Sequence, residues 1–360
     1  MGPVELPSSV LAGLARSGPL EGPVPAVACA AALAASVTVA AVRRRGRRRA
    51  GARPSLLGRL ALGGWLAALT VLGLLAALNA YVGYVPSLTV TAVASPPGGS
   101  RVETIQIPAP SLDVRAAETL VYLPPGYDDA ANAGRRYPVV YLLHGFPGGA
   151  EDWFRSGRAA QTMDGLLAKH LVRPMILVSP SASGRWDHDS EALDQVGGPQ
   201  VQTYLTTTVV RAIDARYRTI PERWARAVGG MSSGGYGALN LGLRHQDVFS
   251  VILAEMPYGD PGDVTASLLG GRRSAWLANA PDRYIPTMTF SAPVAAYLVA
   301  GAADPTLATA RRLAAMLDRR GQDAVFQALP GAGHTWRGAR AELPFALVFA
   351  SRAFAHPALI

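Results

Sequence analysis

The chain has 360 residues, of which 49% are apolar, and it carries a formal charge of +9. This length allows one large α/β domain with additions or two small domains, and the apolar share is high for a soluble protein. The charge is local, because residues 43–59 contain eight arginines and no acidic residue, which leaves the rest of the chain almost neutral. We therefore expect no nucleic-acid-binding surface.

Two uncharged stretches, residues 24–42 and 60–85, flank the arginine-rich segment. Each comes close to the ~20 residues that a helix needs to cross a bilayer. We expect one or two transmembrane helices, at residues 24–42 and 60–82, and the leucine-rich second stretch is the stronger candidate. Because arginine-rich loops stay on the cytoplasmic side, residues 43–59 are predicted to be a cytoplasmic loop, and the domain that follows is predicted to be extracytoplasmic.

A cleaved signal peptide is the alternative interpretation of this region. The apolar core of a signal peptide is about 7–15 residues long. Residues 60–85 are uncharged throughout and clearly longer than that. We therefore favour a retained membrane anchor over residues 1–85.

Cys29 is the only cysteine of the chain. An internal disulfide and a zinc site built on cysteines are therefore excluded, and a thiol nucleophile is disfavoured. The sequence also has no phosphate-binding glycine loop, no dinucleotide fingerprint and no cluster of metal ligands, so we expect no cofactor.

Residues 86–100 are rich in proline, glycine and small residues, and are expected to link the anchor to a domain that covers residues 101–360. Short apolar runs alternate there with helical stretches, which is typical of a parallel sheet with helices on both faces. The expected strands are 101–107, 117–123, 138–143, 175–180, 226–231, 249–255, 294–300 and 324–329, and the expected helices are 158–170, 200–217, 234–245, 305–320 and 339–354.

Two loops interrupt this alternation. Residues 257–290 are rich in glycine and proline and are expected to lie over the carboxyl edge of the sheet, where such folds bind ligands. Residues 181–199 contain a cluster of polar and aromatic side chains that would either line the site or belong to a solvated loop. The cluster consists of Trp186, Asp187, Asp189 and Glu191.

The sequence Gly230-Met231-Ser232-Ser233-Gly234 is a G-x-S-x-G motif between an expected strand and an expected helix. That context is typical of a nucleophile elbow, in which a tight turn presents a serine at a helix N-terminus. The register of the motif selects Ser232 as the nucleophile.

A nucleophilic serine needs a base and an acid, which follow it along the chain in this class of fold. Among the later histidines, His245 lies in the helix after the elbow and His356 in the terminal tail. His334 lies in a glycine-rich loop directly after an expected strand, so we predict it as the general base. Asp304 follows the preceding strand and is the predicted acid, with Glu255 and Asp260 as competitors.

The oxyanion hole is expected where residues 144–149 follow the strand at 138–143. Two backbone N–H groups must point at the developing oxyanion. We predict that Phe146 and Ser233 supply them. His144 and Gly145 are expected to support this loop.

Several blocks of the chain together resemble the putative-esterase family of α/β-hydrolases. That family includes esterase D-type enzymes, esterase domains of iron-siderophore hydrolases, feruloyl esterases and the antigen 85 mycolyltransferases. The blocks are LPPGY (123–127), YLLHGF (141–146), RAVGGMSSGGYGA (226–238), RHQDVF (244–249), GAAD (301–304) and GAGHTW (331–336). The resemblance implies an α/β-hydrolase fold, a Ser232–His334–Asp304 triad and oxyanion donors at Phe146 and Ser233.

The leading hypothesis is a serine esterase that forms an acyl-enzyme on an envelope-bound or lipid-like ester outside the membrane. Two alternatives remain open: transfer of the acyl group to a sugar or lipid alcohol, and a membrane-anchored scaffold without catalysis. The sequence departs from the family at Gln246, where proline is usual. His144 makes the chain more similar to the hydrolases than to the mycolyltransferases, which generally lack a histidine there.

Overall fold

The computed structural model describes residues 1–14, 18–51, 55–87, 99–115, 117–184, 189–262 and 265–356. The chain forms two compact units. One comprises residues 16–90, and the other joins residues 1–15 to residues 91–360. We call them the helical unit and the hydrolase unit.

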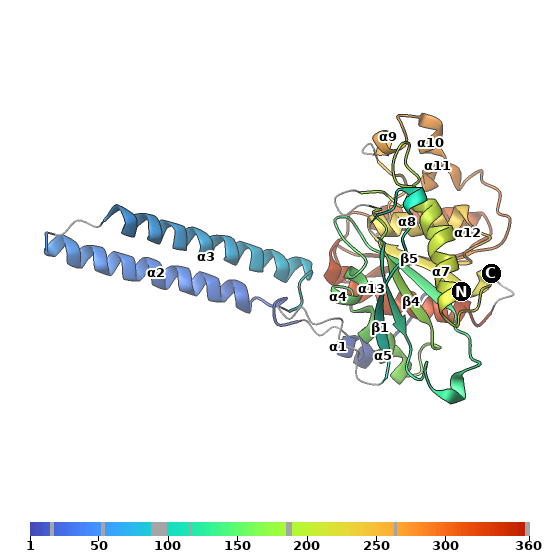
Figure 1. Ribbon diagram of the computed structural model, residues 1–360, viewed down its shortest axis with the longest axis horizontal. Helices are drawn as coiled ribbons and strands as arrows, with labels where there is room; N and C mark the ends of the chain where they lie inside the picture. The colour runs from blue at the N-terminus through green and yellow to red at the C-terminus, as the bar shows by residue number, and fades with distance from the viewer. Residues whose placement is uncertain are drawn as a thin grey trace. The chain divides into compact units, whose positions relative to one another are not determined.

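The helical unit consists mainly of α2 (Val24–Arg49) and α3 (Leu56–Val82), which pack side by side (Figure 1). By length and composition, both helices could cross a membrane. The side chain of Ser55 caps α3 by accepting the Gly58 amide at 3.1 Å. The prediction of a loop over residues 43–59 is wrong for residues 43–49, because α2 continues to Arg49. Arginine is a good helix former, so the run of arginines can extend the helix.

The hydrolase unit is built on an eight-stranded sheet with the order β1-β2-β4-β3-β5-β6-β7-β8. Strands β3 to β8 run parallel, whereas β1 pairs antiparallel with β2 and β2 pairs antiparallel with β4. The mostly parallel sheet expected from the apolar runs is confirmed. The strands are β1 (Arg101–Gln106), β2 (Glu118–Leu123), β3 (Val139–Leu143), β4 (Ile176–Pro180), β5 (Arg226–Met231), β6 (Val251–Glu255), β7 (Ala295–Gly301) and β8 (Asp323–Leu329).

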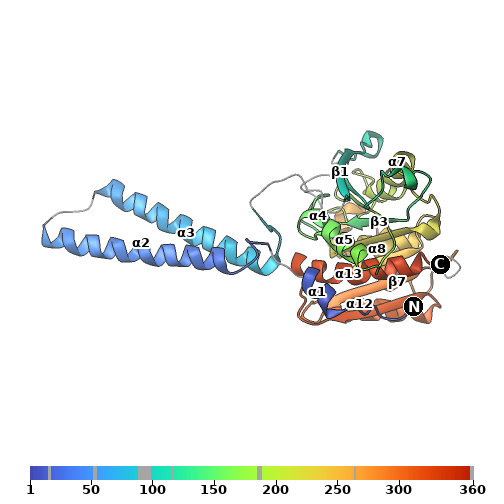
Figure 2. The same ribbon diagram turned by 90° about the horizontal axis from the view of Figure 1, so that it is seen from below.

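Helices cover both faces of this sheet (Figures 1 and 2). On one face pack α7 (Val210–Arg216), α8 (Ser233–Arg244) and α12 (Leu307–Arg319). On the other pack α5 (Ala159–Ala168) and α13 (Trp336–Ala353). Each central strand is therefore buried on both sides, which explains its continuous apolar sequence.

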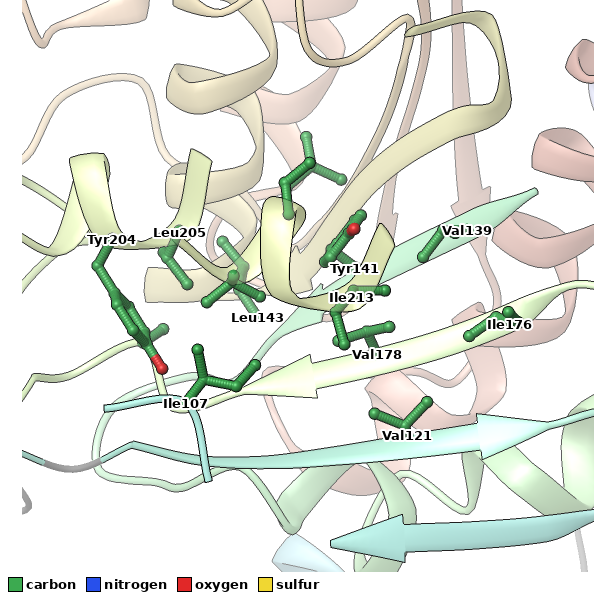
Figure 3. Close-up of a cluster of buried hydrophobic side chains, with 14 of the residues drawn as sticks. Ile107, Val121, Val139, Tyr141, Leu143, Ile176, Val178, Tyr204, Leu205 and Ile213 are labelled. Atoms are coloured by element: carbon green, nitrogen blue, oxygen red, sulfur yellow. The ribbon is translucent and has the colours of Figure 1, made fainter. Parts of the chain in front are cut away.

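Figure 3 shows the core between the first face and α7. Val139, Tyr141 and Leu143 project from β3, and Ile213 of α7 faces them. All four are 2% exposed or less. Burial of one such aliphatic side chain stabilises the fold by roughly 1.5–3 kcal/mol.

The remaining helical segments are short. They are α1 (Ser8–Leu14), η1 (Pro110–Leu112), η2 (Ala130–Asn132), α4 (Asp152–Arg155), α6 (Val201–Thr203), the π-helical η3 (Tyr204–Val209), η4 (Arg223–Ala225), α9 (Thr265–Leu268), α10 (Arg273–Leu277) and α11 (Pro281–Tyr284). The helix expected over 200–217 is thus divided by a π-helical segment. Helix α13 begins three residues before its expected start at 339, because Thr335 caps it by accepting the Gly338 amide.

The N-terminal segment, residues 1–14, packs on the hydrolase unit. Val4 exchanges two hydrogen bonds of 3.1 Å with the side chain of Gln327 on β8. The Met1 ammonium lies 2.5 Å from the Asp323 carboxylate, and α1 packs on α5. This position differs from the expectation that residues 1–85 together form the anchor.

Candidate active site

Ser232 lies between the end of β5 at Met231 and the start of α8 at Ser233, and has φ +56° and ψ −119°. Such a backbone is strained for a residue with a side chain. The turn needs glycine on each side. A Cβ atom at Gly230 would lie 2.4 Å from the Gly234 carbonyl oxygen, and one at Gly234 would lie 2.2 Å from that of Leu143.

The three predicted triad residues lie together. The Ser232 hydroxyl donates to Nε2 of His334 at 2.8 Å. His334 Nδ1 lies 3.0 and 3.2 Å from the two carboxylate oxygens of Asp304. Because Nδ1 faces a carboxylate, it carries the ring proton and leaves Nε2 free to accept.

The two ends of this hydrogen-bonded series differ in exposure. The Asp304 side chain is fully buried, whereas the His334 side chain is 32% exposed. Burial alone would raise the pKa of Asp304, but hydrogen bonds from His334 and from the amide and hydroxyl of Thr306 outweigh it and lower that pKa. The acid is thus ionised and fixed, while the serine end is open to a substrate.

The competing acids lie elsewhere. The Glu255 carbonyl oxygen accepts the Ser232 amide at 3.1 Å, but the Glu255 carboxyl group interacts with Glu342 rather than with His334. Asp260 accepts the amide of Gly262 at 2.8 Å.

The predicted oxyanion donors flank a cavity of about 10 Å³, the size of a single water molecule. Phe146, Gly145 and Ser233 are among its lining residues. In the described part of the chain, neither the Phe146 nor the Ser233 amide donates a hydrogen bond. Ser233 begins α8, so its amide also carries the positive end of the helix dipole.

His144 lies in the loop after β3, where the oxyanion hole was expected, and is 4% exposed. Its Nε2 accepts the amide of Ala182 at 3.0 Å, so Nδ1 holds the proton and donates to the Gly145 carbonyl at 2.8 Å. Burial lowers the pKa of His144 and keeps it neutral. The ring therefore joins the loop after β3 to the loop after β4.

Two acidic side chains lie near the predicted nucleophile, Ser232. Asp189 accepts the Ser233 hydroxyl at 3.0 Å, and Glu191 accepts the hydroxyl of Tyr258. Burial, reinforced by the charge of Asp189, raises the pKa of Glu191 to about 8. Of the predicted polar cluster, Trp186 and Asp187 lie outside the described residues.

Two features of the site were not predicted from the sequence. One is Tyr258, whose ring stacks on Tyr236 with centroids 5.1 Å apart and whose hydroxyl donates to Glu191. The other is Glu342, which is completely buried in α13 near Asp304. The sequence does contain a sign of Glu342, because an acidic residue within the apolar stretch at 339–354 is unusual. Among the described residues, no cluster of three or more possible metal ligands occurs.

Known proteins resemble this chain in sequence. A model of the putative-esterase family matches residues 114–349. An uncharacterized protein of Corynebacterium glutamicum is 28% identical over 240 residues, which are 63% of this chain and 55% of that protein. An esterase of Mycobacterium tuberculosis is 34% identical over 125 residues, which are 34% of this chain and 26% of that protein. The chain thus spans about half, or less, of the length of these relatives.

Solved structures share the fold. A ferulic acid esterase superposes with a TM-score of 0.61 and 27% identity, and covers 71% of this chain and 98% of its own. An S-formylglutathione hydrolase of Agrobacterium tumefaciens has a TM-score of 0.58 and 20% identity, and covers 73% of this chain and 97% of its own. Since the family match extends over more than half of the residues, the chain belongs to the putative-esterase family of α/β-hydrolases.

Proposed function

We propose that this protein hydrolyses carboxylic esters through an acyl intermediate on Ser232. The observation that carries the proposal is the unbroken series of hydrogen bonds from Ser232 through His334 to buried Asp304. The strained backbone at Ser232 supports the same chemistry, and so do the amides of Phe146 and Ser233, which donate no hydrogen bond in the described part of the chain and are available to an oxyanion.

Each group would have one task in the reaction. His334 Nε2 takes the hydroxyl proton as the Ser232 oxygen attacks the ester carbonyl, and the amides of Phe146 and Ser233 stabilise the oxyanion. Asp304 stabilises the imidazolium. The proton on Nε2 then passes to the leaving alcohol, and a water molecule activated by His334 releases the acid and restores Ser232.

We further propose that α2 and α3 anchor the protein in a membrane with the hydrolase unit outside. Residues 1–14 and the chain after residue 99 belong to the same unit, so a chain that crosses through α2 must return through α3. Six of the eight arginines lie at the end of α2, where the positive-inside rule favours the cytoplasm. An envelope-bound or lipid-like ester would suit an enzyme in this position.

The decisive experiment compares Ser232→Ala with the neighbouring Ser233→Ala in the full chain, using p-nitrophenyl esters of increasing acyl length. Ser232→Ala should reduce kcat by about 10⁴-fold or more, because the nucleophile is lost. Ser233→Ala keeps the nucleophile and the backbone amide, so it should retain labelling by a fluorophosphonate.

Three other results would change the proposal. Labelling of Ser232 without turnover, together with product formation when glycerol or trehalose is added, would assign acyl transfer. A folded protein with neither turnover nor labelling would favour the scaffold. Equal activity of the wild type and Ser232→Ala would exclude Ser232 as the nucleophile.

A further inference from the structure

Two buried carboxyl groups lie behind the triad and have no part in the proposed steps. Glu255 ends β6 and is 1% exposed, and Glu342 lies in α13 and is completely buried. Within the described residues, neither has an ion-pair partner. No side-chain donor reaches either carboxyl oxygen of Glu342, or Oε2 of Glu255, and the Gly301 amide is the one backbone group among the described residues that acts on Glu342.

Glu255 and Glu342 belong to backbone segments that adjoin the Ser232–His334–Asp304 site. The Glu255 carbonyl oxygen accepts a hydrogen bond from the Ser232 amide. The amide of the next residue, Met256, donates to the carbonyl oxygen of Val299 in β7 at 2.7 Å. Strand β7 leads to Asp304. Helix α13, which carries Glu342, begins two residues after His334. The pair thus lies where the nucleophile, acid and base segments meet.

The surroundings of Glu255 and Glu342 disfavour the ionised form of both carboxyl groups. Burial raises the pKa of both Glu255 and Glu342 well above the usual value, and the charge of Asp304 raises that of Glu342 further against a smaller effect of the Gly301 amide. Tyr297 of β7 is a further titratable group near the pair, and its hydroxyl donates to Gln327. Asp304 accepts hydrogen bonds from His334 and from the amide and hydroxyl of Thr306, so Asp304 carries the negative charge.

We propose that Glu342 is a positioning residue that stays protonated, shares its proton with Glu255, and leaves Asp304 as the only negative charge behind His334. A second ionised carboxylate there would lack both water and a cation, which makes it costly. The shared proton joins α13 to β6 and so holds the base segment against the nucleophile segment. This inference rests on the proposed esterase function.

The first test measures protonation without activity. In the full-length protein at neutral pH, the infrared spectrum of the wild type minus that of Glu342→Gln should contain the carbonyl stretch of a protonated carboxylic acid. Glu222→Gln, which removes an exposed carboxylate, is the matched control and should give only a carboxylate band. A carboxylate band for Glu342 would overturn the inference.

The second test measures positioning through the pH profile of kcat/KM, whose acidic limb reports the protonation of the essential base. Glu342→Gln keeps a neutral hydrogen-bonding group, so the midpoint of that limb should stay in place and kcat should fall less than about tenfold. An ionised Glu342 would instead have raised the proton affinity of His334, and its replacement would move the limb to lower pH by about one unit.

A third variant separates positioning from packing. Glu342→Leu fills the space but cannot share a proton, so kcat should fall about 10- to 100-fold with KM nearly constant. Full activity in a folded Glu342→Leu protein would contradict the positioning role. If the wild type lacks ester turnover, the proposed function fails, while the infrared result and the pH dependence of fluorophosphonate labelling still decide the state of Glu342.

Discussion

The Asp304 carboxylate fixes which nitrogen of His334 carries the proton. If it acts as the catalytic acid, Asp304→Asn should leave the fold intact but reduce kcat by about 10³- to 10⁴-fold, because an amide permits the wrong tautomer. Glu255→Gln should reduce kcat less than about tenfold, since Glu255 does not contact the imidazole. Steady-state kinetics of the two variants checks this assignment, and the reverse order of effects would make Glu255 the acid.

At the same scale, Glu191 should make stability depend on pH. Its pKa in the folded chain is about 8, raised by burial and by Asp189, against 4.5 ordinarily. A raised pKa means that the stabilising contribution is complete below pH ~4.5 and is lost as pH rises through about 8. The wild type should therefore lose on the order of 2–4 kcal/mol more between pH 5 and pH 9 than Glu191→Gln. Melting curves at both pH values test this, with Glu222→Gln as the control; parallel pH dependence in wild type and Glu191→Gln would refute it.

At the scale of elements, the elbow between β5 and α8 is determined by close backbone approaches. A Cβ atom at Gly234 would also lie 2.6 Å from the His144 carbonyl oxygen. Gly234→Ala should therefore lower the free energy of unfolding by roughly 3–5 kcal/mol, whereas Gly134→Ala, with no atom within 4 Å, should change it by less than about 0.5 kcal/mol. Thermal unfolding of the full chain distinguishes them, and equal effects would mean that the elbow tolerates a side chain.

The strands and the hydrogen-bonded arrangement of Ser232, His334 and Asp304 could be predicted because their signals are local. Strands buried on both faces appear as continuous apolar runs, and the elbow and the His334 loop are contiguous motifs. The approach of Glu342 to Glu255 and of Asp189 to Ser233 could not be predicted, because each joins residues far apart in the chain through tertiary packing. The helical continuation of α2 through its arginines could not be predicted, because a run of arginines is also typical of a solvated loop.

At the scale of the whole molecule, the proposed topology places both ends of the helical pair on one side of the membrane. It can be tested in a Cys29→Ser background by adding single cysteines at three exposed positions, with Ser8→Cys, Ala50→Cys and Ala355→Cys. A membrane-impermeant maleimide added to intact cells should label positions 8 and 355, and position 50 only after permeabilisation. Opposite accessibility of positions 8 and 355 would rule out the paired crossing.

The packing of residues 1–14 on the hydrolase unit has a consequence for release of that unit. Val4 and Met1 hold β8 without a covalent bond, through Gln327 and Asp323. After a protease cuts the chain between residues 87 and 99, residues 1–14 would thus still bind the rest of the hydrolase unit non-covalently. Because only these non-covalent contacts then join the two fragments, shedding would require either a second cut or the dissociation of the contacts.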